Sequence, residues 1–129
     1  MGAVANELGN GIRTGEQYLE GLRDDRDVWM HGEKVKDVTA HPGLSRGAKT
    51  LAEFLDKQFD PELQDLVSYE EDGKRFATSH LIPKSVDDVK KRGAAFYEWA
   101  TWSNGMFGRT PDYKNASVMA FAASADFLA

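Results

Sequence analysis

The spacing of apolar residues along the chain predicts a mostly helical protein. Apolar side chains recur every three to four positions over residues 15–25 and 46–59, which is the period of a helix with one buried face. A third helix is predicted from Ser85, because Asp88 follows three residues later and the pair resembles a capping box. This third helix should run to about Trp102.

Two stretches carry the signals of short β-hairpins instead. In residues 27–38, Val28 and Met30 alternate with Trp29, a His31-Gly32 turn comes next, and Val35 and Val38 follow it. Residues 67–78 form a second hairpin pattern around 71–74, after a short helical turn that Asp60-Pro61 should open. The expected fold class is therefore mainly α with two small β-hairpins.

A last helix is predicted from Thr110, which can cap it, with Pro111 at its first position. Residues 115–129, NASVMAFAASADFLA, hold one charge and six alanines. A helix that is apolar on nearly every side has to be buried on nearly every side. We therefore expect either further chain or another subunit to cover it, and the alternative is a helix enclosed within this domain.

The composition excludes several classes of function. A net charge of −5 gives no general attraction to nucleic acid or to an anionic membrane, and no apolar run approaches the roughly 20 residues that span a bilayer. The absence of cysteine from the sequence excludes disulfides, thiolate nucleophiles and cysteine-ligated clusters. His31, His41 and His80 match no metal-ligand spacing, although His80 could face a pocket. We expect a cytoplasmic protein that binds no metal, nucleic acid or membrane.

Three conspicuous surface features are interpreted as structural. Residues 24–27, Asp-Asp-Arg-Asp, resemble a solvated or salt-bridged helix end. Lys90, Lys91 and Arg92 form a short basic face in the middle of a predicted helix, too small to bind nucleic acid. Trp29 is expected to anchor the first hairpin.

The loop between the third and last helices concentrates groups that bind anions. Gly105 and Gly108 allow another group to approach the backbone closely. Arg109 precedes the capping residue and Tyr113 lies in the first helical turn, so a guanidinium, a phenol hydroxyl and a helix N-terminus converge. Three neighbouring aromatic residues can add a flat apolar wall: Trp99, Trp102 and Phe107. Together these groups suit a small aromatic anion such as a phenolate, whose ionised form Arg109 would favour.

Each of these residues also has a structural interpretation. Arg109 could pair with Asp112, and Tyr113 could be a core residue with a satisfied hydroxyl. Asn115 and Ser117 could contact a ligand, or could serve in capping and local packing. The spacing alone leaves both interpretations open.

Three segments resemble the N-terminal domain of the 4-hydroxyphenylacetate 3-monooxygenase family. They are GEQYLEGLRDDRDVWMHGEKVKDVTAHP, HLIPKSVDDVKKR and GMFGRTPDYKNASVMAFAASADF. The resemblance extends from about Gly15 to the end of the chain, and residues 108–113 are its most specific part. This family comprises the oxygenase components of two-component flavin-dependent hydroxylases, so the resemblance implies the N-terminal helical domain of an acyl-CoA-dehydrogenase-like flavoenzyme.

The resemblance also implies a site and a reaction. Arg109 and Tyr113 match the residues that bind the phenolic oxygen of the substrate, while no catalytic residue is assigned within residues 1–129. A separate flavin reductase would supply reduced FAD, and a phenol such as 4-hydroxyphenylacetate would be hydroxylated at its ortho carbon. The flavin-binding middle and C-terminal domains of the family are not in this chain, so we expect a fragment that is inactive alone. The full-length enzyme is expected to be a homo-oligomer.

Two alternatives accompany this reading. The chain could be a non-catalytic assembly or binding module that joins a partner through its apolar C-terminal helix. A related branch dehydrates 4-hydroxybutyryl-CoA with an iron–sulfur cluster, which needs cysteine thiolates as ligands. Because the sequence has no cysteine and does have Arg109 and Tyr113, the hydroxylase branch is favoured.

Overall fold

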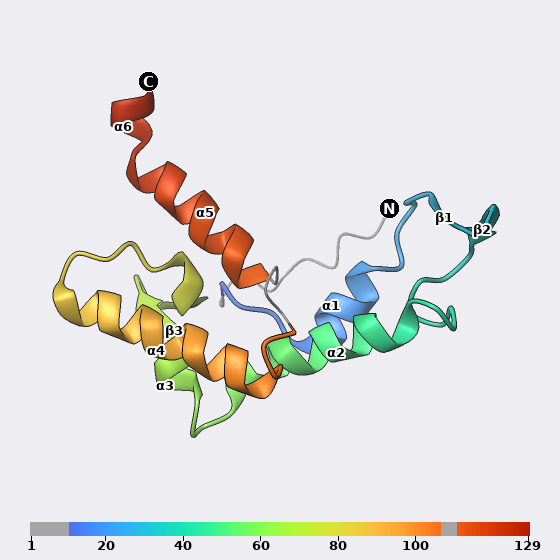
Figure 1. Ribbon diagram of the computed structural model, residues 1–129, viewed down its shortest axis with the longest axis horizontal. Coiled ribbons are helices and arrows are strands. Elements are labelled where there is room, and N and C mark those ends of the chain that lie inside the picture. Colours follow the sequence, from blue (N-terminus) through green and yellow to red (C-terminus); the bar gives the residue numbers. More distant parts are fainter. Residues whose placement is uncertain (1–10, 107–110) are drawn as a thin grey trace. The chain divides into compact units, whose positions relative to one another are not determined.

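The computed structural model describes residues 11–106 and 111–129, and for residues 111 and 112 it describes the backbone alone (Figure 1). The described chain divides into two compact units at the junction of Asp60 and Pro61. The prediction that residues 1–129 form one domain stays a prediction.

In the first unit, helices α1 (Gly15–Gly21) and α2 (Ser45–Asp56) lie side by side (Figure 1). The first predicted helix is confirmed, and Thr14 caps it: the Thr14 hydroxyl accepts from the backbone N–H of Gln17, and the Gln17 side chain accepts from the backbone N–H of Thr14. The predicted helix over 46–59 is also confirmed, with its last turn tightened into the 3₁₀ helix η1 (Lys57–Phe59).

The two helices approach closely at Gly15. Its backbone N–H donates to Oδ1 of Asp56 over 2.7 Å. A β-carbon at Gly15 would lie 2.5 Å from the carbonyl oxygen of Ala52, a backbone atom that cannot move aside. Only glycine allows this packing of α1 on α2.

The predicted first hairpin is confirmed as the antiparallel pair β1 (Val28–Met30) and β2 (Glu33–Val35). His31 and Gly32 both have positive φ, of 53° and 83°, which is the conformation of a two-residue type I′ turn. Trp29 stands opposite Lys34 and is 64% exposed. The expectation that Trp29 anchors the hairpin is therefore wrong: its ring lies on the open face, and Val35 is buried instead.

The second unit begins with the short helix α3 (Gln64–Val67), three residues later than the predicted turn at Pro61. The second predicted hairpin is confirmed as β3 (Ser68–Glu71) and β4 (Lys74–Ala77), joined by Asp72-Gly73. Four helical elements follow: the 3₁₀ helix η2 (Thr78–His80), α4 (Val86–Trp102), α5 (Pro111–Ala123) and α6 (Ala125–Leu128).

Helix α4, the long yellow-to-orange helix in Figure 1, has both of its predicted ends. Ser85 caps it by accepting from the backbone N–H of Asp88 over 3.1 Å. Beyond Trp102, Asn104 has a φ of 51° and Gly105 donates from its backbone N–H to the carbonyl of Ala100 over 2.8 Å. Together with the bond from the Asn104 N–H to the carbonyl of Thr101 over 3.2 Å, this bond forms a Schellman motif, which ends the helix.

The core of the second unit contains buried polar groups as well as apolar ones. Val67, Ser68 and Thr78 are essentially inaccessible to solvent, and Ala95 and Trp99 of α4 are buried as well. Each buried hydroxyl is satisfied: Thr78 donates to the carbonyl of Leu66, and Ser68 donates to a carbonyl of α3 and accepts from Arg75.

Helices α5 and α6 keep much of their apolar surface in contact with solvent. Five large side chains along them are exposed: Tyr113, Val118, Phe121, Phe127 and Leu128. The prediction of a helix starting at Pro111 is confirmed, and the alternative in which this domain encloses it is wrong. The proposed cap at Thr110 lies outside the described residues. Among the described helices, none combines the length and the apolar character needed to cross a bilayer.

Candidate functional site

Of Arg109 and Tyr113, the two residues predicted to bind the phenolic oxygen, the structure describes the side chain of Tyr113 alone, in the first turn of α5. Tyr113 is 57% exposed, so the interpretation of Tyr113 as a core residue is wrong. The Nζ atom of Lys114 lies 5.7 Å from the centroid of the Tyr113 ring, which adds a cation to this end of the helix. Arg109, with Phe107, Gly108 and Thr110, lies outside the described residues, and its pairing with Tyr113 stays a prediction.

Asn115 and Ser117, the two polar residues that follow, have local packing partners. Nδ2 of Asn115 donates to the hydroxyl of Ser79 in η2 over 3.3 Å, and the hydroxyl of Ser117 donates to the carbonyl of Tyr113 over 3.0 Å. Of the two interpretations left open by the sequence, the structure supports local packing for both residues.

A guanidinium inside the second unit holds the turn on which Asn115 rests. Nη1 of Arg92 donates to the carbonyls of Ser79 over 3.0 Å and Leu81 over 2.7 Å, with a longer bond of 3.4 Å to Thr78. Its Cζ atom lies 5.4 Å from the ring centroid of Phe96. Arg92 thus joins α4 to the carbonyls of Thr78 and Ser79 in η2 and of Leu81 just after it.

The interpretation of Lys90, Lys91 and Arg92 as a basic surface face is therefore wrong for two of the three. Lys91 also turns inward, and its Nζ atom donates to the carbonyl of Ser68 over 2.9 Å. The sequence did hold a signal for Arg92, which precedes the buried residues Ala95 and Trp99 by three and seven positions. Those spacings place Arg92 on the buried face of the helix.

His80, also in η2, has a shifted ionisation. Partial burial lowers the pKa of His80 below its usual value, and the nearby charge of Arg92 lowers it further. A neutral imidazole both donates and accepts hydrogen bonds, so η2 presents an uncharged polar group beside the cation.

The aromatic wall expected beside the loop is smaller than predicted. Trp99 is 6% exposed and belongs to the core of the second unit, while Trp102 is half-buried. Phe107 lies outside the described residues. In the described part of the chain, only Trp102 of the three combines proximity to the loop with partial access to solvent.

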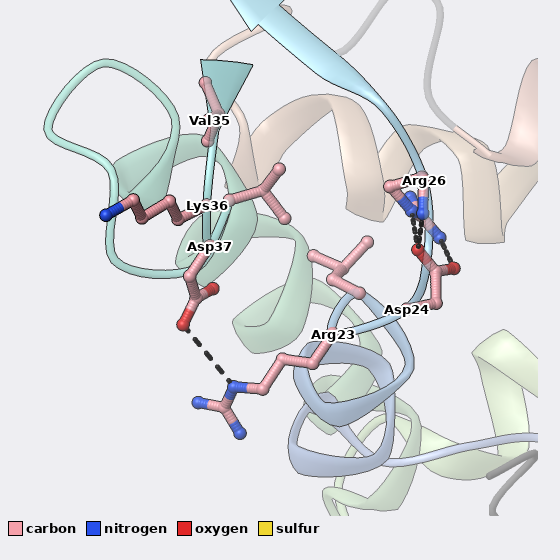
Figure 2. Close-up of a pocket in the computed structure, with 8 residues that line it drawn as sticks. Arg23, Asp24, Arg26, Val35, Lys36 and Asp37 are labelled. Carbon is pink, nitrogen blue, oxygen red and sulfur yellow. Dashed lines mark hydrogen bonds and ion pairs between the residues drawn. The ribbon is translucent and has the colours of Figure 1, made fainter. Parts of the chain in front are cut away.

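The first unit contains a hollow of about 270 Å³ (Figure 2). It lies between the end of α1 and the stretch after β2, with these lining residues: Leu22, Arg23, Asp24, Arg26, Val35, Lys36, Asp37 and Val38. Figure 2 shows Arg23 and Asp37 facing one another, while Arg26 pairs with Asp24. The Nε atom of Arg23 lies 3.7 Å from Oδ2 of Asp37. The hydrogen bond from Arg26 lowers the pKa of Asp24 to about 2.

This hollow does not fit a flavin or a phenol. Four of its charged groups already form pairs, Arg23 with Asp37 and Arg26 with Asp24, and its lining lacks the aromatic or broad apolar wall that a flat ring would need. The predicted salt-bridged helix end over 24–27 is confirmed by the pair of Arg26 with Asp24. Among the described residues, no cluster of three His, Asp or Glu side chains could hold a metal ion.

Comparisons with known proteins place the chain in a family. Residues 14–129 match the family described as 4-hydroxyphenylacetate 3-hydroxylase N terminal. The oxygenase component of 4-hydroxyphenylacetate 3-monooxygenase from Thermus thermophilus is 48% identical over 117 residues, which make up 90% of this chain and 24% of that protein. A Streptomyces globisporus monooxygenase named for a (3S)-3-amino-3-(3-chloro-4-hydroxyphenyl)propanoyl group on a peptidyl-carrier protein is 43% identical over 119 residues, 88% of this chain and 22% of that protein.

A solved structure gives the same result. The crystal structure of the oxygenase component of 4-hydroxyphenylacetate 3-monooxygenase, complexed with FAD and 4-hydroxyphenylacetate, matches with a TM-score of 0.86 and 48% identity. The match covers 89% of this chain and 24% of that one.

The helices and hairpins described above therefore form the N-terminal helical fold of an acyl-CoA-dehydrogenase-like flavoenzyme. More particularly, the chain belongs to the 4-hydroxyphenylacetate 3-hydroxylase N-terminal family. The resemblance identified from the sequence and the predicted fold class are both confirmed. The chain spans about a quarter of the length of the curated relatives it matches.

Proposed function

We propose that this chain supplies the phenol-binding part of a reduced-flavin-dependent aromatic monooxygenase, which hydroxylates a phenol such as 4-hydroxyphenylacetate at its ortho carbon. The observation that carries the proposal is the family match over residues 14–129. The exposed position of Tyr113 in the first turn of α5 supports it, because a residue that recognises a ligand has to be reachable.

The names of the relatives indicate which part of the substrate this chain would recognise. One acts on 4-hydroxyphenylacetate and another on a 3-chloro-4-hydroxyphenyl group that carries a longer chain. Both names contain a phenol with a carbon substituent para to the hydroxyl, and they differ in that substituent. A segment shared by both proteins is suited to binding the common phenolic oxygen, which is the role proposed for Arg109 and Tyr113.

The chemistry proposed for these two residues is binding, orientation and ionisation. The guanidinium of Arg109 and the hydroxyl of Tyr113 would donate hydrogen bonds to the phenolic oxygen, beside the positive end of the α5 dipole. Hydrogen bonds to the charged form lower the pKa of the bound phenol. The resulting phenolate is richer in electrons at its ortho carbon, the atom that takes the new oxygen.

Reduced FAD would supply the two electrons and the activation of oxygen. In the overall reaction, a phenol, dioxygen and reduced flavin give a catechol, water and oxidised flavin. The hollow in the first unit does not fit a flavin, so we assign no residue of this chain to it. We expect other domains of such an oxygenase to hold the flavin, a separate reductase to reduce it, and the enzyme to be a cytoplasmic homo-oligomer.

The alternative function is an assembly module, which the exposed apolar side chains of α5 and α6 favour. Under this alternative, the isolated chain forms a defined complex with a protein that lacks flavin, and Arg109 and Tyr113 are dispensable. The 4-hydroxybutyryl-CoA dehydratase branch remains disfavoured because the sequence has no cysteine for a cluster.

A chimera tests the proposed function. Residues 14–129 of this chain replace the matching segment of the Thermus thermophilus oxygenase, and catechol formation is measured with reductase-supplied FAD. We expect the chimera to hydroxylate 4-hydroxyphenylacetate and Arg109→Ala to lower kcat/KM by about a hundredfold, the size of losing a charge-assisted hydrogen bond of about 3 kcal/mol. A chimera that folds and binds flavin but forms no catechol would contradict the proposal, as would full turnover in Arg109→Ala.

A further inference from the structure

The turn η2 is a buried polar platform against which the first part of α5 packs. Thr78 and Ser79 are 1% and 3% exposed, although both carry hydroxyl groups. The hydroxyl of Thr78 donates to the carbonyl of Leu66 over 2.8 Å, which ties η2 to α3. Arg92 ties it to α4 through the carbonyls of Ser79 and Leu81. The platform is therefore held by α3 and by α4, through contacts that do not involve α5.

Helix α5 needs such a platform because its own sequence does not specify which face turns inward. A helix with one apolar stripe is oriented by burying that stripe. The residues after Tyr113 are instead apolar or small almost all round, so several rotations would bury similar area. A single polar residue with one partner can then set the register, as a lone asparagine does in a coiled-coil core.

Asn115 is that residue in α5. Its Nδ2 atom donates to the hydroxyl of Ser79, and its side chain is half-buried. Residues two positions apart in a helix project to nearly opposite sides. When Asn115 faces η2, Tyr113 faces away from it, in agreement with the 57% exposure of Tyr113.

We infer that Asn115 is a positioning residue, which fixes the rotation of α5 through Ser79 and thereby aims Tyr113 at the phenol. This inference rests on the proposed function for the role of Tyr113, whereas the contact between Asn115 and Ser79 stands independently of it. Asn115 acts through Tyr113 and does not itself contact the substrate.

The first test uses the full chain and no ligand. Asn115→Ala should increase hydrogen exchange of the backbone amides in the first half of α5, measured by NMR or mass spectrometry. Ser117→Ala is the matched control, because its hydroxyl bonds to the carbonyl of Tyr113 within the same helix and not to η2. Equal exchange in Asn115→Ala and the unaltered chain would overturn the inference.

The second test measures the Kd for 4-hydroxyphenylacetate in the chimera. We expect Asn115→Ala to weaken binding about three- to tenfold, the size of one neutral hydrogen bond. In a Tyr113→Phe background the same substitution should have little further effect, because its effect passes through the Tyr113 hydroxyl. Asn115→Asp should restore binding, since the Ser79 hydroxyl can donate to a carboxylate.

The two tests separate the inference from the proposed function. If the effects of Asn115→Ala and Tyr113→Phe on the binding free energy are additive, the two residues act independently. That result would overturn the positioning role, in which Asn115 acts through Tyr113. A chimera in which neither Tyr113→Phe nor Arg109→Ala alters the Kd contradicts the proposed function. In that case, faster exchange in Asn115→Ala would still support the control of the rotation of α5 by Asn115.

Discussion

At the scale of single residues, the ionisation of His80 is the property of η2 that can be measured most simply. Burial is the main cause of its lowered pKa, and the charge of Arg92 is the second. The unfolded chain therefore binds a proton more readily than the folded chain does. The free energy of unfolding keeps its full value above the ordinary pKa of 6.5 and falls as the pH drops from there through the folded pKa.

We predict that an NMR titration of the His80 ring gives a midpoint below 6.5. Arg92→Met should move the midpoint upward, because it removes the neighbouring positive charge. His80→Gln should make the free energy of unfolding depend less on pH between about 7 and 5, since its amide does not titrate. A midpoint at or above 6.5 would show that neither burial nor Arg92 acts on the ring as the structure indicates.

The sequence predicted the residues with distinctive local chemistry better than those whose role depends on tertiary contacts. Tyr113 was predicted as a ligand-binding candidate, and its exposure agrees with that role. Arg92 was interpreted as a surface cation, because the carbonyls of η2 that it binds are 11 to 14 residues away in the chain. The partner of Asn115 lies 36 residues away, and no local pattern indicates it.

At the scale of secondary structure elements, the close approach of α1 and α2 is the most demanding packing contact. We predict that Gly15→Ala lowers the free energy of unfolding by about 1–3 kcal/mol, because the added methyl group overlaps the backbone of Ala52. Gly47→Ala is the matched control within α2, where the space around the added methyl group is open. It should raise the free energy of unfolding by roughly 0.5–1 kcal/mol, the usual gain of alanine over glycine in a helix.

Urea denaturation followed by circular dichroism measures both changes. Opposite signs for the two substitutions are expected. Equal effects at the two positions would mean that α1 does not pack on α2 through Gly15.

Element boundaries were predicted well where the signal is local and less well elsewhere. The Ser85 cap and the end at Trp102 define α4 within the sequence itself, as does the His31-Gly32 turn for the first hairpin. The exposure of Trp29 could not be predicted in this way, because the sequence of a short strand does not show which of its two faces is covered. The rotation of α5 could not be predicted from the sequence either, because apolar residues lie on nearly every side of the helix and do not indicate which face packs inward.

At the scale of the whole molecule, two observations bear on whether other protein surface covers α5 and α6. These are the exposed apolar side chains of the two helices and the partial coverage of the relatives. The chain matches about a quarter of each of these larger proteins. Both the proposed oxygenase and the alternative assembly module require a partner surface for these helices. The two functions differ in whether a phenol is bound beside the start of α5.

The affinity and ionisation of a bound phenol test this difference most directly. In the chimera, 4-hydroxyphenylacetate is titrated at several pH values and its ionisation is followed by ultraviolet difference absorption. We predict that the bound phenol ionises at a lower pH than the free phenol, and that Arg109→Ala and Tyr113→Phe each weaken binding and return the ionisation toward that of the free phenol. Unchanged affinity and unchanged ionisation in both variants would contradict the assignment of phenol binding to this chain.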